Sequence, residues 1–163
     1  MSPVPVARPF RSAPRLLFAA LLTFIGLGAS QAATFRVDDS GTLVSQPVAP
    51  MRWKQLVPGR GADHSVEARL MVAVRLHLVP WLNQPVRLYM GLAPVHSDPV
   101  QASWRTQGRL LAGSVRSGAR TLVYDGTVST ALLEETMELV LTTDGRALVS
   151  PQTLHFHFEI DAP

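Results

Sequence analysis

The chain has 163 residues, 15 of them basic and 12 acidic, and it contains no cysteine. Without cysteine it has no thiol nucleophile, no disulfide and no Cys-ligated zinc, so those classes of enzyme and metalloprotein are excluded. Residues 1–32 hold three of the basic residues and none of the acidic ones, which leaves 12 against 12 in residues 33–163. A net-charge argument for nucleic-acid binding therefore fails for residues 33–163.

Residues 1–32 have the three-part pattern of a cleavable signal peptide. Arginines precede an apolar run at residues 16–28, and Ser30 and Ala32 place small side chains where a signal peptidase cleaves. As a helix this run would be about 20 Å long, against a hydrocarbon core of about 30 Å, so a retained membrane anchor is the less favoured alternative. We expect a signal-peptide helix, cleavage after Ala32, no later membrane span, and export to the periplasm or cell surface.

The apolar pattern after residue 33 has a period of two, which is typical of half-buried strands. Residues 66–78 show it most clearly, because apolar side chains recur at every second position from Val66 to Leu78. The charged residues of this segment fall between them, whereas a helix would scatter those charges around its circumference. Residues 86–92 and 154–160 alternate in the same way. Shorter candidate strands lie near residues 35–38, 51–56, 100–106, 109–116 and 119–125.

Turn residues separate these segments. Ser117-Gly118 is a candidate two-residue hairpin turn, and Asp144-Gly145 is a stronger one. Residues 131–140 (ALLEETMELV) combine good helix formers with alternation toward their end, so we expect a turn there and a strand over about residues 136–143. Together the pattern predicts one all-β domain over residues 33–163, an antiparallel Ig-like β-sandwich of about seven to nine strands.

Candidate catalytic and metal sites are weak. His155 and His157 alternate on the last strand beside Glu159, a spacing that could share a metal, but a polar outer strand face is the favoured interpretation. Glu134 and Glu135 are adjacent and would point to opposite faces of a strand, so a solvated turn is favoured over an acid–base pair. We expect no catalytic residues, no metal and no cofactor.

Two surface features suggest ligand binding. Trp81 and Trp104 are candidates for an aromatic ligand platform, although one or two of the tryptophans are expected in the core. Four arginines concentrate around residues 100–120, where an anionic partner is the alternative to exposed strand faces that discourage edge pairing. These arginines are Arg105, Arg109, Arg116 and Arg120.

The export signal, the cysteine-free domain and the final alternating strand resemble a pilus subunit assembled by the chaperone–usher route. The most suggestive stretch is residues 99–126, with the sequence PVQASWRTQGRLLAGSVRSGARTLVYDG.

 The resemblance implies assembly by β-strand addition, in which a partner's extended segment completes the sandwich.

In this chain the candidate partner strand is the segment that carries Phe35, Val37, Gly41 and Leu43, which share one alternation parity. Asp39 departs from the pattern, because it stands on the parity that should be apolar, and residues 38–41 (DDSG) are equally consistent with a turn. Residues 33–48 are then the domain's own first strand and loop. Both interpretations stay open at this point.

The resemblance implies a structural or assembly protein of the cell envelope or surface, with other envelope or pilus proteins and a periplasmic chaperone as partners. The alternative is a self-sufficient periplasmic sandwich that binds a small ligand, a carbohydrate or a partner protein. An enzyme is the least favoured class, because the sequence offers no set of polar residues with catalytic spacing.

Overall fold

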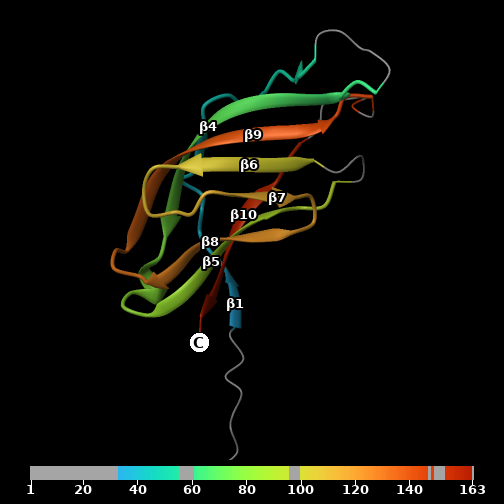
Figure 1. Ribbon diagram of the computed structural model, residues 1–163. Helices are drawn as coiled ribbons and strands as arrows, with labels where there is room; N and C mark the ends of the chain where they lie inside the picture. Colours follow the sequence, from blue (N-terminus) through green and yellow to red (C-terminus); the bar gives the residue numbers. More distant parts are fainter. Residues whose placement is uncertain (1–32, 56–60, 96–99, 147, 149–152, 163) are drawn as a thin grey trace, which may run out of the picture.

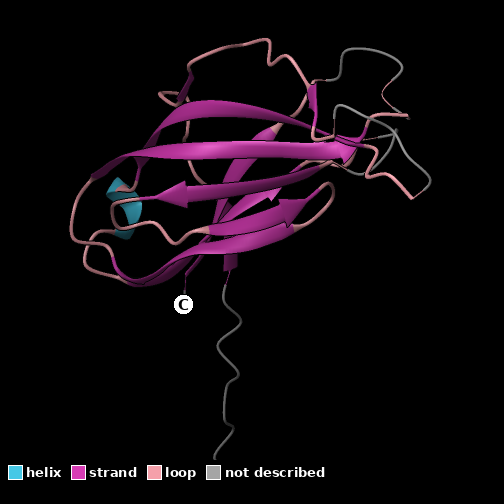
Figure 2. Ribbon diagram, turned by 45° about the horizontal axis from the view of Figure 1, so that its top comes forward, coloured by secondary structure: helices cyan, strands magenta, loops and turns pink. Residues whose placement is uncertain are grey.

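The computed structural model describes residues 33–55, 61–95, 100–146, 148 and 153–162. These residues form ten β-strands and one short 3-10 helix, η1 (Val79–Trp81). The strands make two sheets in which every pairing is antiparallel (Figures 1 and 2). The prediction of an all-β antiparallel fold is confirmed, whereas the described residues form ten strands where about seven to nine were expected. The predicted signal peptide at residues 1–32 lies outside the described residues.

The smaller sheet has four strands in the order β1-β10-β5-β8. Its edge strands are β1 (Ala33–Arg36) and β8 (Arg120–Thr127), and its central strands are β10 (Phe156–Ala162) and β5 (Pro85–Leu92). The first and last described strands are therefore neighbours in space, as Figure 1 shows.

The larger sheet has the order β2-β4-β9-β6-β7, and β3 also pairs with β4. Its two long strands, β4 (Ser65–His77) and β9 (Leu132–Asp144), pair along all 13 residues of each. The other strands of this sheet are β2 (Leu43–Val44), β3 (Arg52–Trp53), β6 (Gln101–Thr106) and β7 (Gly113–Arg116).

The core lies between the two sheets and follows the predicted alternation. On β4 the positions from Val66 to Leu76 that share one parity are buried or half-buried, while Arg69 and Arg75 between them are exposed. Leu76 of β4 and Ile160 of β10, from opposite sheets, are both fully buried members of one hydrophobic cluster. Each such side chain stabilises the fold by about 1.5–3 kcal/mol through the apolar surface it removes from water.

Residues 132–140 all lie on one strand, so the expected turn before residue 136 is wrong. Strand β9 begins at Leu132 and pairs with β4 on one side and with β6 on the other. Hydrogen bonds to two neighbouring strands and burial of Leu133 and Met137 outweigh the helix propensity of the segment.

Neither predicted turn closes a β-hairpin, because the strands before and after each turn belong to different sheets. Gly118 has a φ of +80° and takes part in a turn, but the strands on either side of it, β7 and β8, belong to different sheets. At the second site neither Asp144 nor Gly145 has a positive φ, so a type I′ turn is excluded. Strands β9 and β10 likewise lie in different sheets.

The segment after β1 crosses from one sheet to the other. Val37 is 2% exposed and its amide donates to the carbonyl of Phe158 on β10. At the next residue, the carbonyl of Asp38 accepts a hydrogen bond from the amide of His77 on β4. Residues 37 and 38 thus bond first to the four-stranded sheet and then to the larger sheet, before the chain enters β2. No helix among the described residues is long and apolar enough to cross a membrane.

Candidate functional site

A cluster of polar side chains covers the outer face of the four-stranded sheet. On β10 the residues Phe158 and Ile160 point into the core, so alternation places Glu159 and Asp161 on the opposite face. The strand register sets Glu159 opposite Tyr89 of β5. The cluster therefore follows from the same pattern that builds the core.

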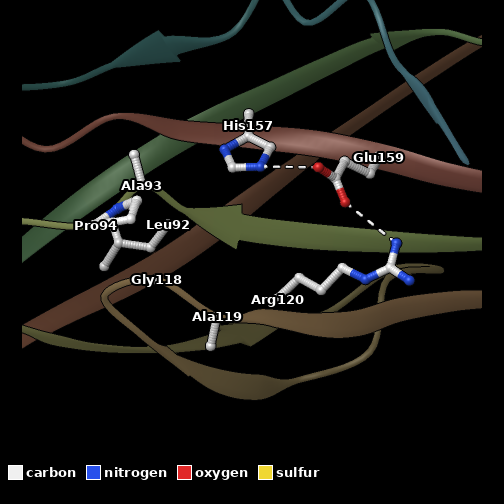
Figure 3. Close-up of a pocket in the computed structure, with 8 residues that line it drawn as sticks. All are labelled: Leu92, Ala93, Pro94, Gly118, Ala119, Arg120, His157 and Glu159. Carbon is white, nitrogen blue, oxygen red and sulfur yellow. Dashed lines mark hydrogen bonds and ion pairs between the residues drawn. The ribbon is translucent and has the colours of Figure 1, made fainter.

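Arg120 joins the far edge strand to β10. Its Nη1 lies 3.2 Å from Oε2 of Glu159 and 3.1 Å from Oδ1 of Asp161, and its Nη2 lies 3.2 Å from Oδ2 of Asp161. The guanidinium reaches these carboxylates across β5, stacked 4.3 Å above the ring of Tyr89. The hydrogen bonds to Asp161 are the main cause of the raised pKa of Arg120. Figure 3 shows the Arg120–Glu159 pair.

Asp161 also binds the near edge strand. The hydroxyl of Thr34 on β1 donates a 2.6 Å hydrogen bond to Oδ1 of Asp161. This bond is the largest cause of the lowered pKa of Asp161, followed by the hydrogen bond from Arg120. One carboxylate therefore connects β1, β10 and β8.

A shallow hollow of about 180 Å³ lies beside this cluster, over the 92–94 and 118–120 segments (Figure 3). His157 lies against the backbone of Gly91, where a Cβ would overlap the imidazole ring. The Nε2 of His157 is 3.3 Å from Oε1 of Glu159. Three charged or titratable groups that line the hollow, Arg120, His157 and Glu159, bind one another through Glu159.

Strand β1 presents a free backbone edge. In an antiparallel pair, hydrogen-bonded residue pairs alternate with pairs that are not hydrogen-bonded. Because Val37 bonds to Phe158, the alternation turns the backbone N–H and C=O groups of Thr34 and Arg36 away from β10. No described strand pairs with β1 on that side, and all four of its residues are exposed.

The four residues of the candidate partner strand are not on one strand. Phe35 lies on β1, 47% exposed, with its ring 6.1 Å from that of Trp81. Val37 is buried, Gly41 lies in a turn against Arg75, and Leu43 lies on β2 with 69% exposure. In this structure the segment pairs within its own domain, with β1 on one sheet and β2 on the other.

The candidate tryptophan platform does not form. Trp104 is 2% exposed, and its Nε1 donates a 2.8 Å hydrogen bond to the carbonyl of Leu111. Trp81 is half-buried in η1 and packs against the core. Since Trp104 is a core residue, it has no face available to a ligand.

The two histidines of the last segment are not part of a metal site among the described residues. His155 precedes β10 and is exposed, while His157 is bound to Glu159. His77 lies on β4, which does not neighbour β10. Within the described ranges, no group of three or more His, Asp or Glu side chains could hold a metal ion.

The arginines of residues 100–120 do not form one patch. Arg120 lies on the four-stranded sheet, whereas Arg105 and Arg116 belong to β6 and β7 of the other sheet. Arg109 lies in the loop between those two strands, where its Nη1 donates to the hydroxyl of Thr130. The predicted concentration of positive charge is therefore divided between two faces and a loop.

Sequence reasoning missed the role of Glu135. Its carboxylate accepts hydrogen bonds from three consecutive backbone amides, at 3.1 Å from Gly108, 2.8 Å from Arg109 and 3.0 Å from Leu110. A visible signal was its position between Leu133 and Met137, on the buried parity of the strand. A solvated turn is thus the wrong interpretation of Glu135, while the exposed Glu134 on the other face pairs with Arg75.

No protein-family model, curated protein or solved structure matches the chain. Any function assigned to it therefore depends on its own residues and their geometry.

Proposed function

We propose that the chain is an exported, non-enzymatic structural or assembly protein of the cell envelope or surface, with a pilin-like Ig fold, which acts by β-strand pairing with a partner protein. The observation that carries the proposal is the free edge of β1. Its outward backbone groups at Thr34 and Arg36 are those a partner's strand would bind.

The side chains of β1 suit an edge that receives another strand. The sequence ATFR contains no proline and no lysine, and both residue types are common devices against edge pairing. Phe35 offers a half-exposed ring beside Trp81, which gives an incoming strand an apolar contact. Backbone hydrogen bonds would supply affinity, and this aromatic pair would supply selectivity.

The compartment in the proposal comes from the signal-peptide pattern at residues 1–32. We assign the polar cluster a structural part in this proposal, because its ion pairs join the strands of the four-stranded sheet. Other envelope or pilus proteins and a periplasmic chaperone are the partners we propose.

The test compares Arg36→Pro with Arg36→Ala in protein purified from its own envelope after mild cross-linking. Proline removes an amide that faces the free edge and leaves the bonds between β1 and β10 in place, whereas alanine removes only the side chain. We expect a partner or polymer to be recovered with the wild type and Arg36→Ala, and to be lost with Arg36→Pro. A lone monomer in all three cases, or equal recovery with Arg36→Pro, would overturn the proposal.

A second candidate is a self-sufficient periplasmic sandwich that binds a ligand or a partner protein through its faces. The observation in its favour is that residues 33–44 pair with both sheets of their own domain and bury Val37. This candidate predicts a monomer that unfolds cooperatively and gains no stability from an added peptide of residues 33–44. Stabilisation by that peptide would count against it.

A further inference from the structure

Side chains of β1 contact the rest of the molecule at Phe35 and at Thr34. Phe35 meets Trp81, and Thr34 donates its hydroxyl to Asp161. The four residues of β1 are all exposed, so burial contributes little to holding this strand in place. The free edge is therefore held by its backbone bonds to β10 and by the polar bond at Thr34.

Strand geometry explains why that bond is short. Thr34 and Asp161 form a pair that is not hydrogen-bonded through the backbone, and in such pairs the side chains approach most closely. The acceptor is an ionised carboxylate, which makes the bond stronger than one between neutral groups. At 2.6 Å it lies in the range of charge-assisted O–H···O bonds.

Asp161 is itself held in place from the opposite side. Arg120 of β8 binds both of its oxygens, and Thr34 shares Oδ1 with Arg120. The carboxylate cannot rotate away from Thr34 without losing the paired contact with the guanidinium. The far edge of the sheet, β8, thus fixes the acceptor that positions the near edge, β1.

We infer that Thr34 and Asp161 form a latch that positions β1 as the receiving edge, with Arg120 orienting the acceptor. This inference rests on the proposed function, because it concerns the regulation of the same edge. With the latch closed, the outward amides of Thr34 and Arg36 are held in line for an incoming strand. With the latch open, β1 frays and the receiving edge is lost.

Amide hydrogen exchange of the purified full chain tests the latch without any partner. The reporter is the amide of Val37, which bonds to Phe158 where β1 meets the core. Thr34→Val removes the hydroxyl and keeps the shape of the side chain, whereas Thr34→Ser keeps a hydroxyl. We expect exchange at Val37 to be about tenfold faster in Thr34→Val, the effect of one bond to a charged group, and close to wild type in Thr34→Ser.

Asp161→Asn gives a second variant, with Asp125→Asn as its control. Asp125 is an exposed carboxylate of the same sheet that pairs with Arg87 and has no bond to β1. We expect faster exchange at Val37 with Asp161→Asn and no change with Asp125→Asn, while core amides of β4 exchange at the wild-type rate in both.

Unchanged exchange at Val37 in Thr34→Val, or equal acceleration in Thr34→Ser, would overturn the latch. Acceleration of core amides together with Val37 would also overturn it, because that result means general destabilisation. Partner recovery from the envelope is a separate measurement. A latch that passes the exchange test in a protein that recovers no partner leaves the latch standing and removes the proposed function.

Discussion

The sharpest stability prediction concerns Glu135. Three backbone amides of the loop between β6 and β7 donate to its carboxylate at 2.8–3.1 Å. The loop carries Leu110, which is 3% exposed, into the core. Replacement of Glu135 should therefore release both the loop backbone and an apolar side chain.

The magnitude follows from the contacts. Hydrogen bonds to a charged group contribute about 1.5–3 kcal/mol each when buried, but Glu135 is only half-buried and water can replace part of the loss. We expect Glu135→Ala to lower the free energy of unfolding by about 2–3 kcal/mol. Glu135→Gln should cost about 1–2 kcal/mol, because one amide oxygen still accepts bonds while the NH₂ group cannot.

The matched control is the preceding residue. Glu134→Gln removes a carboxylate from the same strand, but its partner is the exposed Arg75 at 3.2 Å. Exposed ion pairs of this kind contribute between about 0 and 1 kcal/mol. The assay is urea unfolding of the three variants, with amide exchange at Leu110 as a local readout.

The result that would refute the reasoning is equal destabilisation by Glu134→Gln and Glu135→Gln. Unchanged exchange at Leu110 in Glu135→Ala would refute it as well, because the loop amides would then not depend on the carboxylate.

Three further predictions follow from the core and the polar cluster. Trp104→Ala should cost about 3–5 kcal/mol in urea unfolding, the usual cost of deleting a buried aromatic side chain, and half-buried Trp81→Ala should cost less. Because the pKa of Asp161 is lower in the folded protein than its ordinary 3.8, the stability it contributes is complete above the unfolded pKa and is lost as the pH falls through the folded one. Asp161→Asn should therefore flatten the acid limb of the stability–pH curve. Arg120→Lys should destabilise the protein by about 1 kcal/mol in the same unfolding assay, because an ammonium cannot bind both oxygens of Asp161 in the same planar geometry.

The parts of the fold that sequence could predict are those set by local alternation. On β4 the apolar parity runs unbroken from Val66 to Leu76, so its inner and outer faces were predicted correctly. On β9 the helix formers of residues 131–140 obscured the same pattern. The strand there is decided by pairing with β4 and β6, and those partners lie far away in the sequence.

The candidate site was beyond sequence reasoning for the same reason. Thr34 and Asp161 are 127 positions apart, and Arg120 and Asp161 are 41 apart. No local spacing indicates that they meet, because the meeting depends on the order of the strands. The residues that sequence did single out, such as Trp104 and His155, were chosen for their chemical type, and the fold placed the first in the core and the second outside β10.

The edge strands of the two sheets differ in how far they are protected against pairing with another strand. This difference supports a role for β1 in pairing with a partner. Strands β2 and β3 are only two residues long, and the segment between them contains Pro47 and Pro50. Strand β8 receives a backbone bond at Val123 from the amide of Leu111. Short strands, nearby prolines and edge cover all discourage unwanted pairing. Strand β1 is twice as long as β2 or β3 and contains no proline, and no described strand covers its outer edge. A carboxylate fixed by Arg120 also holds it in line. An open edge that is held in place is expected where pairing with another chain is used.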